Sequence, residues 1–194
     1  MVSEIGIKIL SGLDEARSFF SQVSLLIRTG DDMLGEAGWE CFSTNKCADL
    51  TGSIHRPNKW IPQTIYRLYQ LPGGENAEAE NDTILFLGVL LDRKGAWSGF
   101  QEPWLTFGLY QFLPGQNTHG FPPESWVEEP LNEGYDPDGS FTPWENPGND
   151  PLENEGVLYQ EVAAVPLITI QGSEDLKRVV IEPLLAKVQV RLAG

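Results

Sequence analysis

Histidine and cysteine are scarce in this chain. Its 194 residues include two of each: His55, His119, Cys41 and Cys47. A zinc site built from several histidines is therefore excluded, and neither histidine stands in an HExxH pattern or beside a cysteine at ligand spacing. The cysteines are separated by five residues, which fits neither CxxC redox chemistry nor the common zinc knuckles. We expect two reduced thiols, with a disulfide or a metal pair as alternatives.

Basic residues are also few. Thirteen Lys and Arg oppose 28 Asp and Glu, which gives a net charge of −15 at pH 7. Such a surface repels nucleic-acid phosphates and anionic lipid headgroups, so we expect neither direct nucleic-acid binding nor a membrane partner. An acidic inhibitor that mimics nucleic acid is a remaining alternative, although it needs carboxylates spread over a rigid face.

Long apolar runs are missing. The most apolar stretch, residues 83–91, is far shorter than the roughly 20 residues that span a bilayer. The first residues, MVSEIGIKIL, lack the basic region and small-residue cleavage site of a secretory signal. We therefore expect a cytoplasmic protein.

Hydrophobic residues are numerous enough for a core. They make up 41% of the chain, and the 6 Trp, 5 Tyr and 9 Phe add large side chains to bury. A chain of this length ordinarily forms one domain, so we expect residues 1–194 to fold as a single unit.

Two amphipathic helices are predicted near the ends of the chain. The first runs over 13–29 after a capping pair, Ser11 and Asp14, and glycines are expected to end it. Its apolar stripe and the terminating glycines are Leu13, Ala16, Phe20, Val23, Ile27, Gly30, Gly35 and Gly38. The second begins at Ser173, carries acids in its first turn and should kink or split at Pro183.

Strands are predicted between the two helices. Residues 60–71, 83–91, 103–112 and 158–171 are rich in β-branched, leucine and aromatic side chains. Residues 83–91 are apolar on both faces, which is typical of a central strand. The order of helix, strands, helix predicts an α+β fold with an antiparallel sheet of about five strands, one face of which both helices cover.

A long acidic insertion, 114–156, interrupts this pattern. It holds eight of the 14 prolines, ten acids and no Lys or Arg. Its five large aromatics argue for burial against the domain: Phe121, Trp126, Tyr135, Phe141 and Trp144. We expect a flap over a sheet face or edge, with a ligand- or protein-binding surface as the first alternative.

A cation site is the second alternative for the insertion. Asp136 and Asp138 in YDPDGS offer carboxylates at alternate positions, a weak sign of a divalent cation. An EF-hand is excluded, because the glycine is fourth from Asp136 and the twelfth residue is Pro147. We otherwise expect no cofactor.

One basic segment departs from the general acidity. Between residues 46 and 67, four bases oppose one acid, which gives plus three, and HRPNKW brings together His55, Arg56, Lys59 and Trp60. These residues can bind an anionic ligand or an acidic partner through charge-assisted hydrogen bonds. Pairing with the chain's own acidic insertion is the favoured interpretation.

No catalytic or nucleotide-binding motif stands out. The chain has no GxSxG elbow, no GxGxxG and no P-loop lysine. We expect a non-catalytic binding or regulatory module that recognises a protein or a small ligand, with Trp97, Trp104, Trp126 and Trp144 as exposed anchors. The alternative is a carboxylate-based or divalent-metal-dependent hydrolase.

Overall fold

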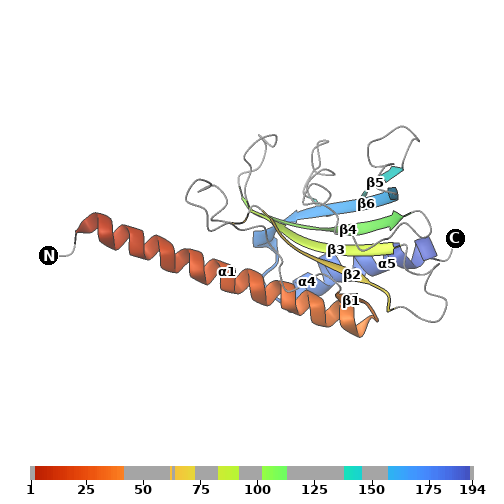
Figure 1. Ribbon diagram of the computed structural model, residues 1–194, viewed down its shortest axis with the longest axis horizontal. Coiled ribbons are helices and arrows are strands. Elements are labelled where there is room, and N and C mark those ends of the chain that lie inside the picture. The colour runs from red at the N-terminus through yellow and green to blue at the C-terminus, as the bar shows by residue number, and fades with distance from the viewer. Residues whose placement is uncertain are drawn as a thin grey trace.

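One antiparallel sheet of six strands and two helical segments make up the described part of the chain (Figure 1). The computed structural model describes residues 3–41, 62, 64–72, 83–91, 102–112, 138–145 and 157–192. The elements are α1 (Glu4–Glu36), β1 (Glu40–Cys41), β2 (Thr64–Gln70), β3 (Thr83–Leu90), β4 (Trp104–Phe112), β5 (Thr142–Glu145), β6 (Val157–Pro166), η4 (Leu167–Thr169), α4 (Ser173–Leu176), η5 (Lys177–Ile181) and α5 (Glu182–Leu192). The predicted α+β class is confirmed.

The strands follow the order β1-β2-β3-β4-β6-β5, and every neighbouring pair is antiparallel. All eight residues of β3 are buried, as predicted for a central strand. The sheet of about five strands is confirmed in outline, with six strands observed. Two short edge strands were missed: β1 has two residues, and β5 has four and lies within the proline-rich insertion.

The third difference among the strands concerns the predicted segment 158–171. Strand β6 ends at Pro166, and the chain continues into the 3₁₀ turn η4. The leucine and isoleucines of LITI resemble strand residues in composition. The turn is instead closed by the hydroxyl of Thr169, which donates to the carbonyl of Pro166 at 2.7 Å.

Helix α1 is much longer than the predicted 13–29. Its N-cap is Ser3, whose hydroxyl accepts the backbone N–H of Gly6 at 3.0 Å. The predicted cap, Ser11, lies inside the helix, where its hydroxyl donates to the Glu15 carboxylate of the next turn. The capping pattern was wrong because an earlier serine supplies the cap.

The glycines of α1 have different roles. Gly30 does not end the helix; it is buried where α1 approaches β3, and a Cβ there would lie 2.5 Å from a methyl of Leu87. Gly38 is the residue that ends it, with a φ of +88° just after the C-cap, as is common at helix ends.

The C-terminal helical segment starts at Ser173, as predicted. Its first turn is held by Asp175, whose carboxylate accepts the backbone N–H of Gln171 and pairs with Arg178. A π-helical turn, η5, ends at Ile181, two residues before Pro183. Proline has no N–H and its ring crowds the carbonyl four residues earlier, so the wider turn accommodates it without ending the helix.

Both helical segments pack on the same face of the sheet, which confirms the prediction (Figure 1). Val23 and Leu34 of α1, and Val180 and Leu184 of the C-terminal segment, share one cluster with inward-facing strand residues. The other face carries a second buried cluster, which includes Phe86. The expected flap concerns residues mostly outside the described ones. Within it, Phe141 packs edge-to-face on Phe107 at 5.5 Å between ring centroids.

Candidate functional site

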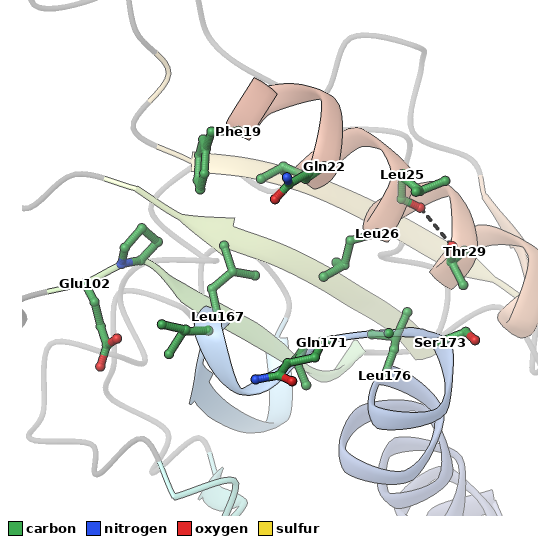
Figure 2. Close-up of a pocket in the computed structure, with 15 residues that line it drawn as sticks. Phe19, Gln22, Leu25, Leu26, Thr29, Glu102, Leu167, Gln171, Ser173 and Leu176 are labelled. Carbon is green, nitrogen blue, oxygen red and sulfur yellow. Dashed lines mark hydrogen bonds between the residues drawn. The ribbon is translucent and has the colours of Figure 1, made fainter. Parts of the chain in front are cut away.

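An apolar groove lies beside α1. It has a volume of about 740 Å³ and lies between α1 and the chain segment 167–176, which contains η4 and α4 (Figure 2). Its apolar lining is Phe19, Val23, Leu25 and Leu26 from α1, and Pro103, Leu167, Ile168, Ile170 and Leu176 from the opposite side. Cavities of this size and character bind ligands or side chains in many proteins.

The groove exists because the chain leaves the sheet abruptly after β6. The N–H of Leu167 donates to the carbonyl of Pro103 at 2.9 Å, which anchors the turn next to the start of β4. This turn holds Ile168 outward, with 71% of its surface exposed, and Leu25 on the α1 rim is 65% exposed. Two uncovered apolar side chains therefore face solvent at the two rims.

The polar side chains of the lining offer few reactive groups. They are Gln22, Thr29, Glu102, Gln171 and Ser173, and Glu102 is the one ionisable side chain among the described lining residues. The hydroxyl of Thr29 is already used, since it donates to the carbonyl of Leu25 at 2.9 Å (Figure 2). The lining thus fits an apolar occupant whose orientation a few amides and one carboxylate can fix.

A first polar network ties α1 to β2. Asp31 accepts from the guanidinium of Arg67 at 3.0 Å and from the hydroxyl of Tyr69 at 2.8 Å. Burial, and then the charge of Asp31, raise the pKa of Tyr69. Burial lowers the pKa of Arg67, but the bond to Asp31 and nearby negative groups raise it by more. None of the three lines the groove, and we assign them a structural role.

A second polar network ties β6 to α5. The buried carboxylate of Glu161 accepts from Lys187 at 2.5 Å and from the hydroxyl of Tyr159 at 3.0 Å. The ammonium of Lys187 also lies 5.3 Å from the ring centroid of Phe141, and Arg191 stacks at 3.7 Å on Tyr159. Both carboxylate oxygens of Glu161 are therefore bonded, which favours a structural role here too.

Most of the predicted binding residues lie outside the described part of the chain: His55, Arg56, Lys59, Trp60, Trp97 and Trp126. Trp144 is in β5, where its backbone pairs with Gln160, and its side chain is not among those described. The prediction that Trp104 is an exposed anchor was wrong, because Trp104 begins β4 and is only 7% exposed. Arg67, from the basic segment, finds an acidic partner in α1.

The predicted cation ligands are only half described. Asp136 lies outside the described residues, whereas Asp138 is exposed in a turn and accepts the N–H of Ser140 at 2.8 Å. This backbone hydrogen bond, with a weaker contribution from the Ser140 side chain, lowers the pKa of Asp138. Among the described residues, no three His, Cys, Asp or Glu side chains gather as metal ligands. The cation site stays a prediction.

The groove itself was not predicted. Leu25 stands off the apolar stripe of α1, and Ile168 follows Pro166, so both carried a weak sign of an exposed apolar position. The strand-like composition of 158–171 concealed the turn that brings Ile168 to the surface.

Comparisons with known proteins found no relative of this chain. No protein-family model, no curated protein and no solved structure matches this chain. Within the described residues, no helix has the length and apolar character to cross a membrane.

Proposed function

We propose that this protein is a non-catalytic recognition module that binds an apolar segment of a partner protein in the groove between α1 and residues 167–176. The observation that carries the proposal is the pair of exposed apolar rims, Leu25 and Ile168, on either side of an apolar cavity of about 740 Å³. Exposed apolar surface around a groove is a common mark of a protein interaction site.

The charge of the groove favours a polypeptide over a fatty acid or another small anion. The described lining contains no Lys or Arg that would pair with an anionic headgroup, and it contains Glu102. The whole chain carries a net charge of −15. We therefore infer a partner segment with apolar anchors and a basic flank, which the acidic protein attracts at long range. The expected compartment is the cytoplasm.

The test is a selection with a defined probe. A phage-displayed library of amphipathic peptides is panned against the full chain, and the dissociation constants of selected peptides are measured by titration calorimetry. We expect enriched peptides to carry apolar anchors beside Lys or Arg. Leu25→Asp and Ile168→Asp should each weaken binding by more than about tenfold, because each removes an apolar contact worth roughly 1.5 to 3 kcal/mol when fully buried.

The matched control is Ile7→Asp, which introduces the same charge into α1 at a comparably exposed position, 56% against 65% for Leu25. It lies outside the groove lining and should leave peptide affinity unchanged. Selected peptides that bind Leu25→Asp and Ile168→Asp as tightly as the unmodified chain would overturn the assignment of the groove. A library that yields no binder would overturn it as well.

A further inference from the structure

Helix α1 extends well beyond the sheet. Its C-terminal half packs on the sheet, while its N-terminal half projects away from the body of the protein (Figure 1). The projecting half exposes five large apolar side chains: Ile5, Ile7, Ile9, Leu10 and Leu13. An isolated helix of this length with glycines at positions 6 and 12 is only marginally stable in water. A surface that packs on this half would stabilise it.

The projecting half repeats the packing pattern of the buried half. Four residues of α1 are buried at the sheet: Val23, Ile27, Gly30 and Leu34. Eighteen residues earlier, five full helical turns, stand Ile5, Ile9, Gly12 and Ala16. The two sets therefore lie on the same side of the helix. The stripe of Ile5, Ile9, Gly12 and Ala16, here called the outer stripe, has the form of a packing surface.

Gly30 shows how closely a neighbouring element can pack against such a stripe. There the methyl of Leu87 approaches the helix so closely that a Cβ would lie 2.5 Å away. At Gly12, in the same phase, a Cβ would meet nothing within 4 Å. The outer stripe thus has the same close-approach position as the inner one, without a neighbour in it.

We propose that the outer stripe binds the outer stripe of a second copy of this chain, with the two helices antiparallel. In that orientation the large Ile9 lies over the partner's Gly12, and Ile5 lies over the partner's Ala16. Each large side chain meets a small one, as Leu87 meets Gly30 within the chain. A parallel pair would instead place Ile9 against the partner's Ile9 and Gly12 against the partner's Gly12.

Charge complementarity selects the same orientation. Lys8 and Glu15 are seven residues apart, so they lie on one flank of the outer stripe. In antiparallel helices equal flanks meet, so Lys8 faces the partner's Glu15 and the symmetric pair forms as well. In a parallel pair this flank would meet the opposite flank, where Gly6 and Leu13 carry no charge.

The overall charge distribution also favours the antiparallel dimer. Residues 1–20 contain three acids and two bases, a net charge of −1, so the rest of the chain carries −14 of the total −15. Antiparallel helices place the two acidic bodies at opposite ends, whereas parallel helices would place them side by side. The two bases of the projecting half also fall short of the Lys- and Arg-rich face that draws amphipathic helices to anionic membranes.

The register of the antiparallel helices fixes the length over which they overlap. With Ile9 over the partner's Gly12, the first helical turn reaches the partner near residue 18, just before Phe19 and Phe20 become half-buried. The paired region covers residues 3–18, about 24 Å of helix. This short contact predicts a reversible dimer that depends on concentration.

The experiment is sedimentation velocity of the full chain over a concentration series reaching about 100 μM, where a dimer with a dissociation constant of about 10 μM is mostly formed. We expect a monomer–dimer equilibrium. Ile9→Asp should raise the dissociation constant by at least about tenfold. The matched control is Ile7→Asp, on the other side of the helix and 56% exposed against 59% for Ile9, which should change it by less than about twofold.

Charge reversal tests the orientation. Lys8→Glu should weaken the dimer by about threefold to tenfold, and adding Glu15→Lys should restore it. Lys8 also pairs with Glu4 on its own helix at 2.9 Å, and that pair stays broken in the double variant. Restoration therefore reports the contact between helices.

Three results would overturn the proposal. They are a monomer at every concentration, equal effects of Ile9→Asp and Ile7→Asp, and a double variant no stronger than Lys8→Glu. Flotation with phosphatidylcholine and phosphatidylserine vesicles tests whether the outer stripe binds a membrane instead of a second copy of the chain. A monomer that binds vesicles through Ile9 would assign the outer stripe to lipid and refute the dimer. The proposed groove is unaffected by either outcome, since no outer-stripe residue lines it.

Discussion

Strand β6 lies close to β4 at Gly108, which supports a sharp prediction for Gly108→Ala. Gly108 of β4 pairs with Phe86 in β3 and with Val162 in β6. A Cβ there would collide with the backbone carbonyl oxygen of Glu161, and it would lie 2.7 Å from the Phe86 ring and 3.0 Å from the Cα of Val162. Two of these three atoms belong to the β6 backbone, so they cannot move without disturbing the β4–β6 pairing.

The expected magnitude follows from what must shift. Overpacking costs about 1 to 3 kcal/mol when side chains can yield, and a backbone collision belongs at or above the upper end. Gly30→Ala should cost less, because the atom in the way is a methyl of Leu87 and the helix gains up to about 1 kcal/mol of propensity. Gly35→Ala, with nothing within 4 Å, is the matched control and should be neutral or stabilising.

Urea unfolding, followed by tryptophan fluorescence and far-ultraviolet circular dichroism, measures all three free energies of unfolding. We expect Gly35→Ala to be the most stable, Gly30→Ala to be intermediate and Gly108→Ala to lose about 3 kcal/mol or more. A Gly108→Ala variant that unfolds at the same urea concentration as Gly35→Ala, with an unchanged m-value, would refute the close approach of β4 and β6.

Three further predictions concern the polar networks and the core. Burial and Asp31 raise the pKa of Tyr69, so the stability that this proton contributes is complete below the ordinary tyrosine pKa of about 10 and declines as the pH rises above it. Tyr69→Phe should cost about 1 kcal/mol at pH 7 and make the loss of stability between pH 9 and about 11 shallower; an equal slope in both proteins would contradict the Asp31 bond. Lys187→Met should destabilise by about 1 to 3 kcal/mol, because it leaves the buried Glu161 with only the Tyr159 hydroxyl, and an unchanged melting temperature would argue against the pair. Leu34→Ala, at a position with 0% exposure, should cost about 2 to 5 kcal/mol by urea titration, against less than about 0.5 kcal/mol for Leu10→Ala in the projecting half.

The hydrophobic pattern predicted the fold well where burial decides it. The uninterrupted apolar run of β3 indicated a central strand, and the stripe through Val23 and Ile27 indicated which side of α1 meets the sheet. The pattern failed where contacts distant in sequence decide. Glycine is common where helices end, but Gly30 stays inside α1, at a position where the helix packs closely against Leu87.

The candidate site was much less predictable than the fold. A groove depends on how two separate elements lie relative to each other, and neither α1 nor residues 167–176 carries that information alone. The polar networks are similar: Asp31 and Arg67 are ordinary charged residues in sequence, and only the packing of α1 on β2 brings them to 3.0 Å. Tryptophans were also poor predictors of a binding surface, as Trp104 shows, because burial and binding both favour large aromatic side chains.

The two proposals assign two regions of one helix to separate tasks, and these regions adjoin, since Val23 lines the groove and has the same helical phase as Ile5 of the outer stripe. Leu25, on the groove rim, and Ile9, in the outer stripe, are 16 residues apart, which corresponds to a rotation of about 160° around the helix axis. A substitution at either of these two positions should therefore leave the other region intact, and the effects of Leu25→Asp and Ile9→Asp on peptide affinity and on dimerisation should each appear in one assay only. Coupling between the two assays would instead mean that the partner's helix tip, which ends beside Phe19 at the groove, changes the groove itself. Measuring peptide affinity for the Ile9→Asp monomer and for the dimeric wild type decides between two independent regions and a coupled pair.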